Sequence, residues 1–387
     1  MPNLGDPDDR MKKCAKVFNA IFTGFCCMDA SCIGIDLGTM FTTAAASNGG
    51  RSCIRSEVGF ARDAIAKHLI GEDVVIGELV NKHRQALSVV RPFERNSLKL
   101  AITEDQFRSI VNTEDQPSLT AASALVSHTV QSLGIPSESE MRCVVGIPAG
   151  ASIYSQRLVL DLIEAVTPYV AVVSEPFAVG FGLGSEANNS IIIDIGAGTV
   201  DYCYYYGAFP SEQDQATLGY GGDHVDEELR RVILETYPEA KVSETAVRGI
   251  KERYGSVGDT VKKAVVELPT RDGRSNKFDL TELVRETCVG FANKITNGLA
   301  KHISSIDNDD FFIDGAKILL AGGGSQLHGL DEYIGQALSI GERCEVSRIH
   351  DCKFAGAMGA LELARSLPED GWQFLSNFKP EVGRDAA

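Results

Sequence analysis

Two short motifs each place a carboxylate, glycines and a threonine at the end of an apolar run. They are I-G-I-D-L-G-T at residues 33–39 and I-I-D-I-G-A-G-T at residues 192–199. An Asp at the carboxyl end of a central strand points into the crevice where α/β proteins bind ligands. The glycines allow a tight turn, and consecutive backbone N–H groups in such a turn can hold phosphate oxygens. Both motifs therefore predict a phosphate-binding hairpin, with Thr39 and Thr199 as hydroxyl donors.

The repetition of the motif carries its own information. A single copy could be only a strand-end turn, but two copies about one domain's length apart indicate two related domains that face each other. Asp36 and Asp194 would then lie on either side of one phosphate chain. Because carboxylates repel phosphate, a divalent cation is expected between them. Mg²⁺ suits hard oxygen ligands and often keeps some of its water.

Three further stretches fit a nucleotide site. Glu175 follows an apolar strand and could orient or deprotonate a water that attacks a γ-phosphate, although an exposed turn glutamate is the alternative. The glycine loop at 219–229 leads into a helix whose N-terminus could approach phosphate, or Asp223 could simply cap that helix. The three consecutive glycines at 322–324 would let an adenine ring lie against bare backbone, unless they form only a tight turn.

Several function classes are excluded or disfavoured. The sequence has no G-x-x-x-x-G-K-[ST] loop, no G-x-G-x-x-G fingerprint and no H-E-x-x-H motif. A net charge of −16 argues against a nucleic-acid partner, whose binding surface would be basic. The ten cysteines include no C-x-x-C pair, which argues against zinc ribbons. No apolar run approaches the roughly 20 residues of a membrane-spanning helix.

The N-terminal segment raises a separate question. Residues 12–27 begin with basic residues and continue with a short apolar run, without an A-x-A cleavage site after it. They could form an interfacial helix that contacts a membrane directly. The alternative is a loosely ordered extension.

The remaining sequence alternates between strand and helix patterns, which predicts an α/β fold with parallel or mixed sheets. Strands are expected at 32–37, 142–147, 170–173, 190–195, 202–207 and 318–321. Helices are expected at 118–133, 155–166, 224–236, 242–252, 281–304 and 355–366.

Taken in order, these stretches resemble the actin-like ATPase superfamily, which includes actin, the Hsp70 nucleotide domain, sugar kinases and MreB. The resemblance extends from about residue 32 to residue 364. It implies two related α/β domains, each with a subdomain, on either side of a nucleotide cleft. The expected divisions are an extension at 1–31, domain I at 32–184 plus 345–366 with a subdomain at about 53–93, domain II at 185–344 with a subdomain at about 226–286, and a tail at 367–387.

Among the branches, bacterial filament proteins fit best. I-K-E-R-Y-G at 250–255 is similar to a helix segment of MreB, and S-E-P-F-A-V-G-F-G-L at 174–183 resembles the magnetosome-organising filament proteins of the MamK type. This implies an ATPase that polymerises head to tail with its own copies in the cytoplasm, alongside magnetosome membranes and with adaptor proteins. An MreB-type cell-shape filament is the alternative, and a small-molecule kinase of the same fold is less favoured.

The same resemblance assigns roles to individual residues. Glu175, Thr199 and Asp194 would carry out hydrolysis, and Asp36 and Asp194 would hold Mg²⁺ partly through water. ATP or ADP would be bound by Asp36, Gly38, Thr39, Met40, Gly196, Ala197, Gly198, Thr199, Gly222, Asp223, Lys251, Gly322, Gly323, Gly324 and Ser325.

Three stretches depart from the family pattern. Met40-Phe41 replaces small residues after the first G-T, which puts the geometry of the phosphate turn in question. Arg248-Gly249 replaces an acidic–basic pair near the expected ribose contact. R-P-F-E-R-N at 91–96 replaces the MreB sequence R-P-L-K-D-G.

Overall fold

The computed structural model describes residues 31–372, except 95–97, 114–115, 137–138, 259–261, 307–315 and 339–343. The N-terminal extension, including residues 12–27, and the end of the tail at 373–387 lie outside the described residues. So does part of the R-P-F-E-R-N stretch. Every helix in the described part of the chain is too short or too polar to cross a bilayer.

The first sheet has five strands in the order β3-β2-β1-β7-β8. An antiparallel meander of β1 (Ser31–Leu37), β2 (Phe41–Ala46) and β3 (Arg51–Arg55) is extended by the parallel strands β7 (Met141–Ile147) and β8 (Tyr169–Ser174). The apolar side chains of β1 and β7 pack in one core with those of α5 (Pro117–Gln131) and α6 (Ile153–Glu164). The long apolar runs of these central strands reflect burial on both faces.

The second sheet repeats this arrangement, with the order β11-β10-β9-β14-β15. Here the meander contains β9 (Ser190–Ile195), β10 (Val200–Tyr205) and β11 (Gln215–Leu218), and the parallel strands are β14 (Ala316–Ala321) and β15 (Cys344–Arg348). The two similar sequence motifs therefore belong to two sheets with the same arrangement of strands. One boundary differs from the prediction: residue 345 does not return to the first domain, because β15 pairs with β14.

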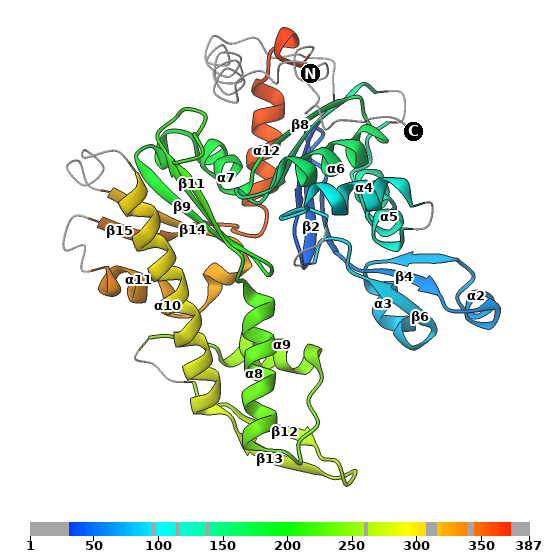
Figure 1. The fold of residues 1–387 in the computed structure, drawn as a ribbon, viewed down its shortest axis with the longest axis vertical. Coiled ribbons are helices and arrows are strands. Elements are labelled where there is room, and N and C mark those ends of the chain that lie inside the picture. The colour runs from blue at the N-terminus through cyan, green and yellow to red at the C-terminus, as the bar shows by residue number, and fades with distance from the viewer. Residues whose placement is uncertain are drawn as a thin grey trace.

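Two helices lie between the sheets, α7 (Glu175–Leu183) and α12 (Ala355–Ser366) (Figure 1). They approach so closely that a Cβ on Gly359 would lie 1.8 Å from the carbonyl oxygen of Ala178. α12 also lies against β1, where a Cβ on Gly34 would lie 2.1 Å from the carbonyl oxygen of Ala357. Glycine is therefore required at position 359, where α12 meets α7, and at position 34, where β1 meets α12. Trp372 is fully buried in the same core.

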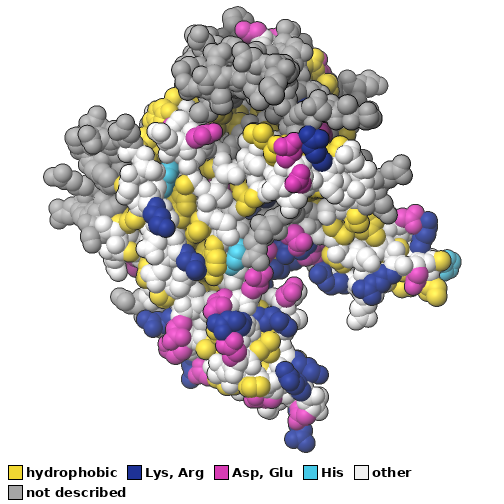
Figure 2. Space-filling model, viewed as in Figure 1, with side chains coloured by type: hydrophobic (Ala, Val, Ile, Leu, Met, Phe, Trp, Pro, Cys, Tyr) yellow, Lys and Arg dark blue, Asp and Glu magenta, His cyan; other side chains and the backbone are white. Residues whose placement is uncertain are grey.

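Two arms extend from the sheets on one side of the molecule (Figure 1). The smaller arm contains β4 (Val58–Ala61), β5 (Val74–Ile76), β6 (Leu87–Val90), α2 (Ala64–Ile70) and α3 (Glu78–His83). The larger arm contains α8 (Gly222–Thr236), α9 (Glu244–Tyr254), β12 (Val265–Pro269), β13 (Ser275–Asp279) and α10 (Thr281–Ser305). The surface is hollowed between the arms (Figure 2).

The prediction of an α/β fold is confirmed, and the ends of all predicted strands and helices agree with the structure to within two residues. The short elements were not predicted. They include the strands β2 and β3, the individual strands and helices of the smaller arm, the β12–β13 hairpin, α4 (Glu104–Asn112) and α11 (Leu330–Ala337). Strands such as β13, with the sequence S-N-K-F-D, carry no apolar alternation that would set them apart from a loop.

Candidate functional site

The two predicted hairpin turns lie directly against each other. The first links β1 to β2 through Gly38, Thr39 and Met40, and the second links β9 to β10. A Cβ on Gly198 of the second turn would lie 2.5 Å from Oγ1 of Thr39 in the first. This proximity requires glycine at position 198 and brings the two turns to the same place between the domains. Met40-Phe41 does not prevent the turn, because Phe41 is simply the first residue of β2.

The two predicted metal ligands are bordered by glycine backbone. A Cβ on Gly356 at the start of α12 would lie 3.0 Å from Oδ2 of Asp36. A Cβ on Gly322 would lie 2.3 Å from Oδ1 of Asp194, and the φ of +73° at Gly322 also favours glycine. Larger side chains at these two positions would displace the carboxylates.

Glu175 is buried at the first turn of α7, which excludes the exposed turn glutamate considered above. Its Oε1 accepts a hydrogen bond of 3.1 Å from Nζ of Lys99, and the two side chains are only 9% and 6% exposed. Burial lowers the pKa of Lys99, but the charges of Glu175 and Asp36 outweigh this effect and raise it overall. Lys99 therefore remains charged at neutral pH.

Asp201, two residues after Thr199, belongs to the same buried group. It accepts hydrogen bonds from the hydroxyls of Thr199 and Thr217 and from the backbone N–H of Ala149 in the first domain. Burial and the nearby charge of Glu175 raise the pKa of Asp201 to about 7 despite these bonds. The carboxylate joins the second hairpin to the loop after β7.

The carboxylates around Glu175 outnumber the positively charged side chains among them. Burial, followed by the charge of Glu175, raises the pKa of Asp36 to about 7 and the pKa of Asp194 well above its usual value. Three buried carboxylates, those of Glu175, Asp194 and Asp201, and the half-buried carboxylate of Asp36 thus share one buried amine, that of Lys99. The described residues contain no set of three or more His, Cys, Asp or Glu side chains arranged to hold a metal. A cation beside Asp36 and Asp194 would therefore take its other ligands from water or phosphate, as Mg²⁺ commonly does.

The glycine loop before α8 is attached to the second hairpin. The backbone N–H of Gly222 donates to the carbonyl oxygen of Gly196 at 3.0 Å, and that of Asp223 donates to the carbonyl oxygen of Ala197 at 2.8 Å. The N-cap of α8 is Gly221, so the alternative that Asp223 caps this helix is wrong. Its carboxylate instead binds two arginines.

Lys251 and Arg248 project from α9 toward the start of α8. Lys251 Nζ lies 2.7 Å from Asp226 Oδ1 and donates to the carbonyl oxygen of Gly222 at 2.8 Å. Arg248 Nε lies 3.1 Å from Asp226 Oδ2, so the departure at 248 introduces an ion pair. Gly249 faces open space.

The third glycine motif follows β14. A Cβ on Gly324 would lie 2.3 Å from Cγ2 of Ile195, whereas Gly323 has open space beside it. Ser325 is fully buried, and its hydroxyl donates to the carbonyl oxygen of Gly322 at 2.7 Å. Gly323 thus leaves its backbone beside open space, while the hydroxyl of Ser325 is already bonded within the turn.

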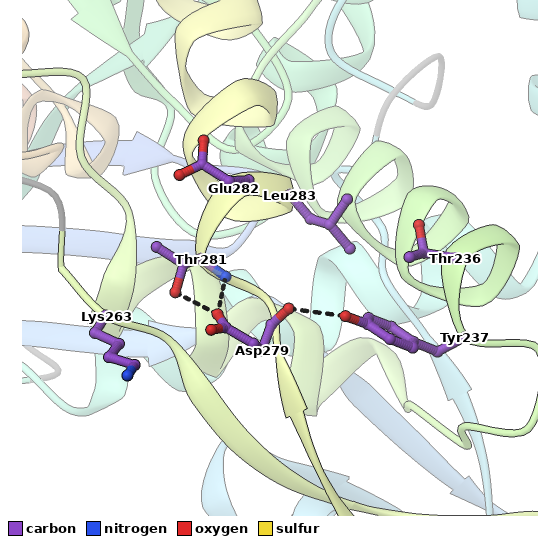
Figure 3. A pocket seen from close by; sticks show the side chains of 7 residues that line it. All are labelled: Thr236, Tyr237, Lys263, Asp279, Thr281, Glu282 and Leu283. Carbon is purple, nitrogen blue, oxygen red and sulfur yellow. Dashed lines mark hydrogen bonds between the residues drawn. The ribbon is translucent and has the colours of Figure 1, made fainter.

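A hollow of about 560 Å³ lies elsewhere, on the larger arm (Figure 3). Its lining comprises Thr236, Tyr237, Lys263, Asp279, Thr281, Glu282 and Leu283, none of which was predicted to belong to the site. Tyr237 and Thr281 donate hydrogen bonds to Asp279 there. The predicted residues gather instead at the strand ends between the two sheets.

Sequence reasoning missed three cations of the site. Lys99 lies in an L-K-L segment with no motif, whereas Arg91 and Arg248 stand out in the sequence only as parts of departures from the family pattern. The only sequence signal for Lys99 is its position between two leucines, outside any pattern typical of a surface. Nothing in the local sequence shows that Arg91 contacts the second domain.

The sequence matches a known protein family and its relatives. The family model described as "MreB/Mbl protein" matches residues 30–367. The chain is 33% identical over 345 residues to "Actin-like protein MamK" of Paramagnetospirillum magneticum, covering 89% of this chain and 95% of the relative. It is 26% identical over 211 residues to "Cell shape-determining protein MreB" of Escherichia coli, covering 51% of this chain and 59% of the relative.

Solved structures give the same result. The structure entitled "MamK double helical filament" superposes with a TM-score of 0.78 at 31% identity, covering 88% of this chain and all of that chain. MreB 5 of Spiroplasma citri bound to AMPPNP superposes with a TM-score of 0.68 at 16% identity, covering 85% and 94% of the two chains, which shows the fold alone. The fold is actin-like, and the chain belongs to the MreB/Mbl family.

Proposed function

We propose that this chain is an ATPase that polymerises into filaments with ATP bound and hydrolyses it to drive filament turnover. The observation that carries the proposal is the contact between the two hairpins, Gly198 against Thr39, beside the buried carboxylates. Similarity to a filament of MamK, and to relatives solved with AMPPNP or ADP, supports both assembly and the nucleotide.

Each part of the site has a role in this proposal. The two turns would hold the phosphates through backbone N–H groups and the hydroxyl of Thr39. Asp36 and Asp194 would hold Mg²⁺, which when bound would neutralise phosphate charge. Glu175 would orient and deprotonate the attacking water, with Lys99 fixing its carboxylate and Thr199 assisting.

The proposed assembly is head to tail, because a heterologous contact repeated along one direction builds an open filament. The proposed setting is the cytoplasm beside magnetosome membranes, with adaptor proteins as further partners. The match to MamK covers 89% of this chain, whereas the match to Escherichia coli MreB covers 51%. This difference in coverage supports an organelle-organising role over a cell-shape role.

The test compares filament assembly with phosphate release. With ATP and Mg²⁺, wild-type protein is expected to sediment as filaments and release phosphate. Glu175→Ala should still assemble but release phosphate about 100- to 10,000-fold more slowly, the usual contribution of a positioned acid or base. The control is Glu362→Ala on the outer face of α12, where the side chain is 51% exposed. Phosphate release at the wild-type rate by Glu175→Ala would reject the catalytic assignment.

A further inference from the structure

One ion pair connects the two domains across the mouth of the site. Nη2 of Arg91, just after β6 of the smaller arm, lies 2.6 Å from Oδ2 of Asp223 on α8 of the larger arm. The same nitrogen lies 3.4 Å from the carbonyl oxygen of Thr39 in the first hairpin. Arg91 thus links the first phosphate turn to a helix of the opposite domain.

Asp223 has a second arginine on its other oxygen. Nη2 of Arg248 lies 3.4 Å from Oδ1 of Asp223. The side chains of Arg91, Asp223 and Arg248 are only 22%, 16% and 15% exposed. Ion pairs withdrawn from water to this extent are screened less by salt than surface pairs and interact more strongly.

Opening of the domains would affect Arg91 and Arg248 differently. Arg248 belongs to the same domain as Asp223 and is held in place by Asp226. If the arms moved apart, Asp223 would keep Arg248 as a partner, while Arg91 would be carried away with the smaller arm. The carboxylate is therefore never left without a cation, and separation of Arg91 costs less than breaking an isolated buried pair.

We propose that Arg91 and Asp223 form a latch between the domains that holds the cleft closed and sets the rate at which nucleotide leaves. This inference rests on the proposed nucleotide site, and it adds a residue pair that controls exchange. The backbone N–H of Asp223 also donates to the carbonyl oxygen of Ala197, so this latch residue is bonded directly to the second phosphate turn.

The test measures release of a fluorescent ADP analogue from the full chain. Protein loaded with the analogue and Mg²⁺ is mixed rapidly with excess unlabelled ADP, for wild type, Arg91→Met and Arg91→Lys. Arg91→Met is expected to speed release by roughly 5- to 150-fold, the usual range for coupling between sites. Arg91→Lys should restore part of the slow release because it keeps the charge. The matched control is Lys67→Met, on the same arm but 58% exposed.

A second variant separates a latch from general support of α8. Arg231→Met removes the ion pairs of Arg231 with Glu228 and Glu235 on α8, where the Arg231 side chain is 53% exposed, so release should be no faster than in wild type. Equal acceleration by Arg231→Met and Arg91→Met would overturn the latch, as would an unchanged rate in Arg91→Met. Absence of analogue binding by the wild-type protein would instead reject the proposed nucleotide site, so the two failures are distinguishable.

Discussion

Replacing Lys99 with methionine tests the charge arrangement of the site most directly. The substitution keeps most of the length of the side chain but removes the one buried amine that the described residues place among four carboxylates. The Lys99–Glu175 pair is 3.1 Å long, and its side chains are 6% and 9% exposed. Removing one partner of such a buried pair costs about 3–5 kcal/mol, because the other charge remains uncompensated. Lys99→Met should therefore destabilise the nucleotide-free protein by about that amount.

The assay is urea unfolding of the nucleotide-free protein in EDTA. The control is Lys67→Met, which breaks the Lys67–Asp73 pair of 2.6 Å, whose side chains are 58% and 65% exposed. An exposed pair of this kind contributes about 0–1 kcal/mol. The double variant Lys99→Met with Glu175→Gln should recover much of the lost stability, because it removes both charges. Equal losses in Lys99→Met and Lys67→Met would refute the reasoning, as would no recovery in the double variant.

The remaining predictions concern pH and packing. Because the pKa values of Asp36 and Asp201 are raised from 3.8 to about 7, the folded state binds more protons than the unfolded state between these values. Stability of the nucleotide-free protein should therefore fall as pH rises from about 4 to about 7, and thermal unfolding of Asp36→Asn should show a smaller slope. Gly359→Ala would place a Cβ 1.8 Å from the carbonyl oxygen of Ala178 and should lower the melting temperature strongly. Gly249→Ala, with open space in the middle of α9, should be neutral or stabilising by up to about 1 kcal/mol in the same measurement.

The sequence by itself determined the strands that carry the site. The apolar runs that end in Asp36 and Asp194, and the glycines that follow them, are local features whose conformation depends on nearby residues. The repetition of the motif was likewise sufficient to predict two related domains, which the matching strand orders confirm. Glu175 could be selected because it directly follows an apolar strand and precedes a proline.

Only the tertiary structure decided which charges meet. Lys99 reaches Glu175 from 76 positions away, and Arg91 reaches Asp223 from 132 positions away, so neither contact has a local signature. Asp223 would have been an N-cap in an isolated helix, but Gly221 takes that position because the loop is bonded to the second hairpin. Local patterns specify backbone conformation, whereas pairing of buried charges depends on how two domains pack. That packing fixes the electrostatics of this site.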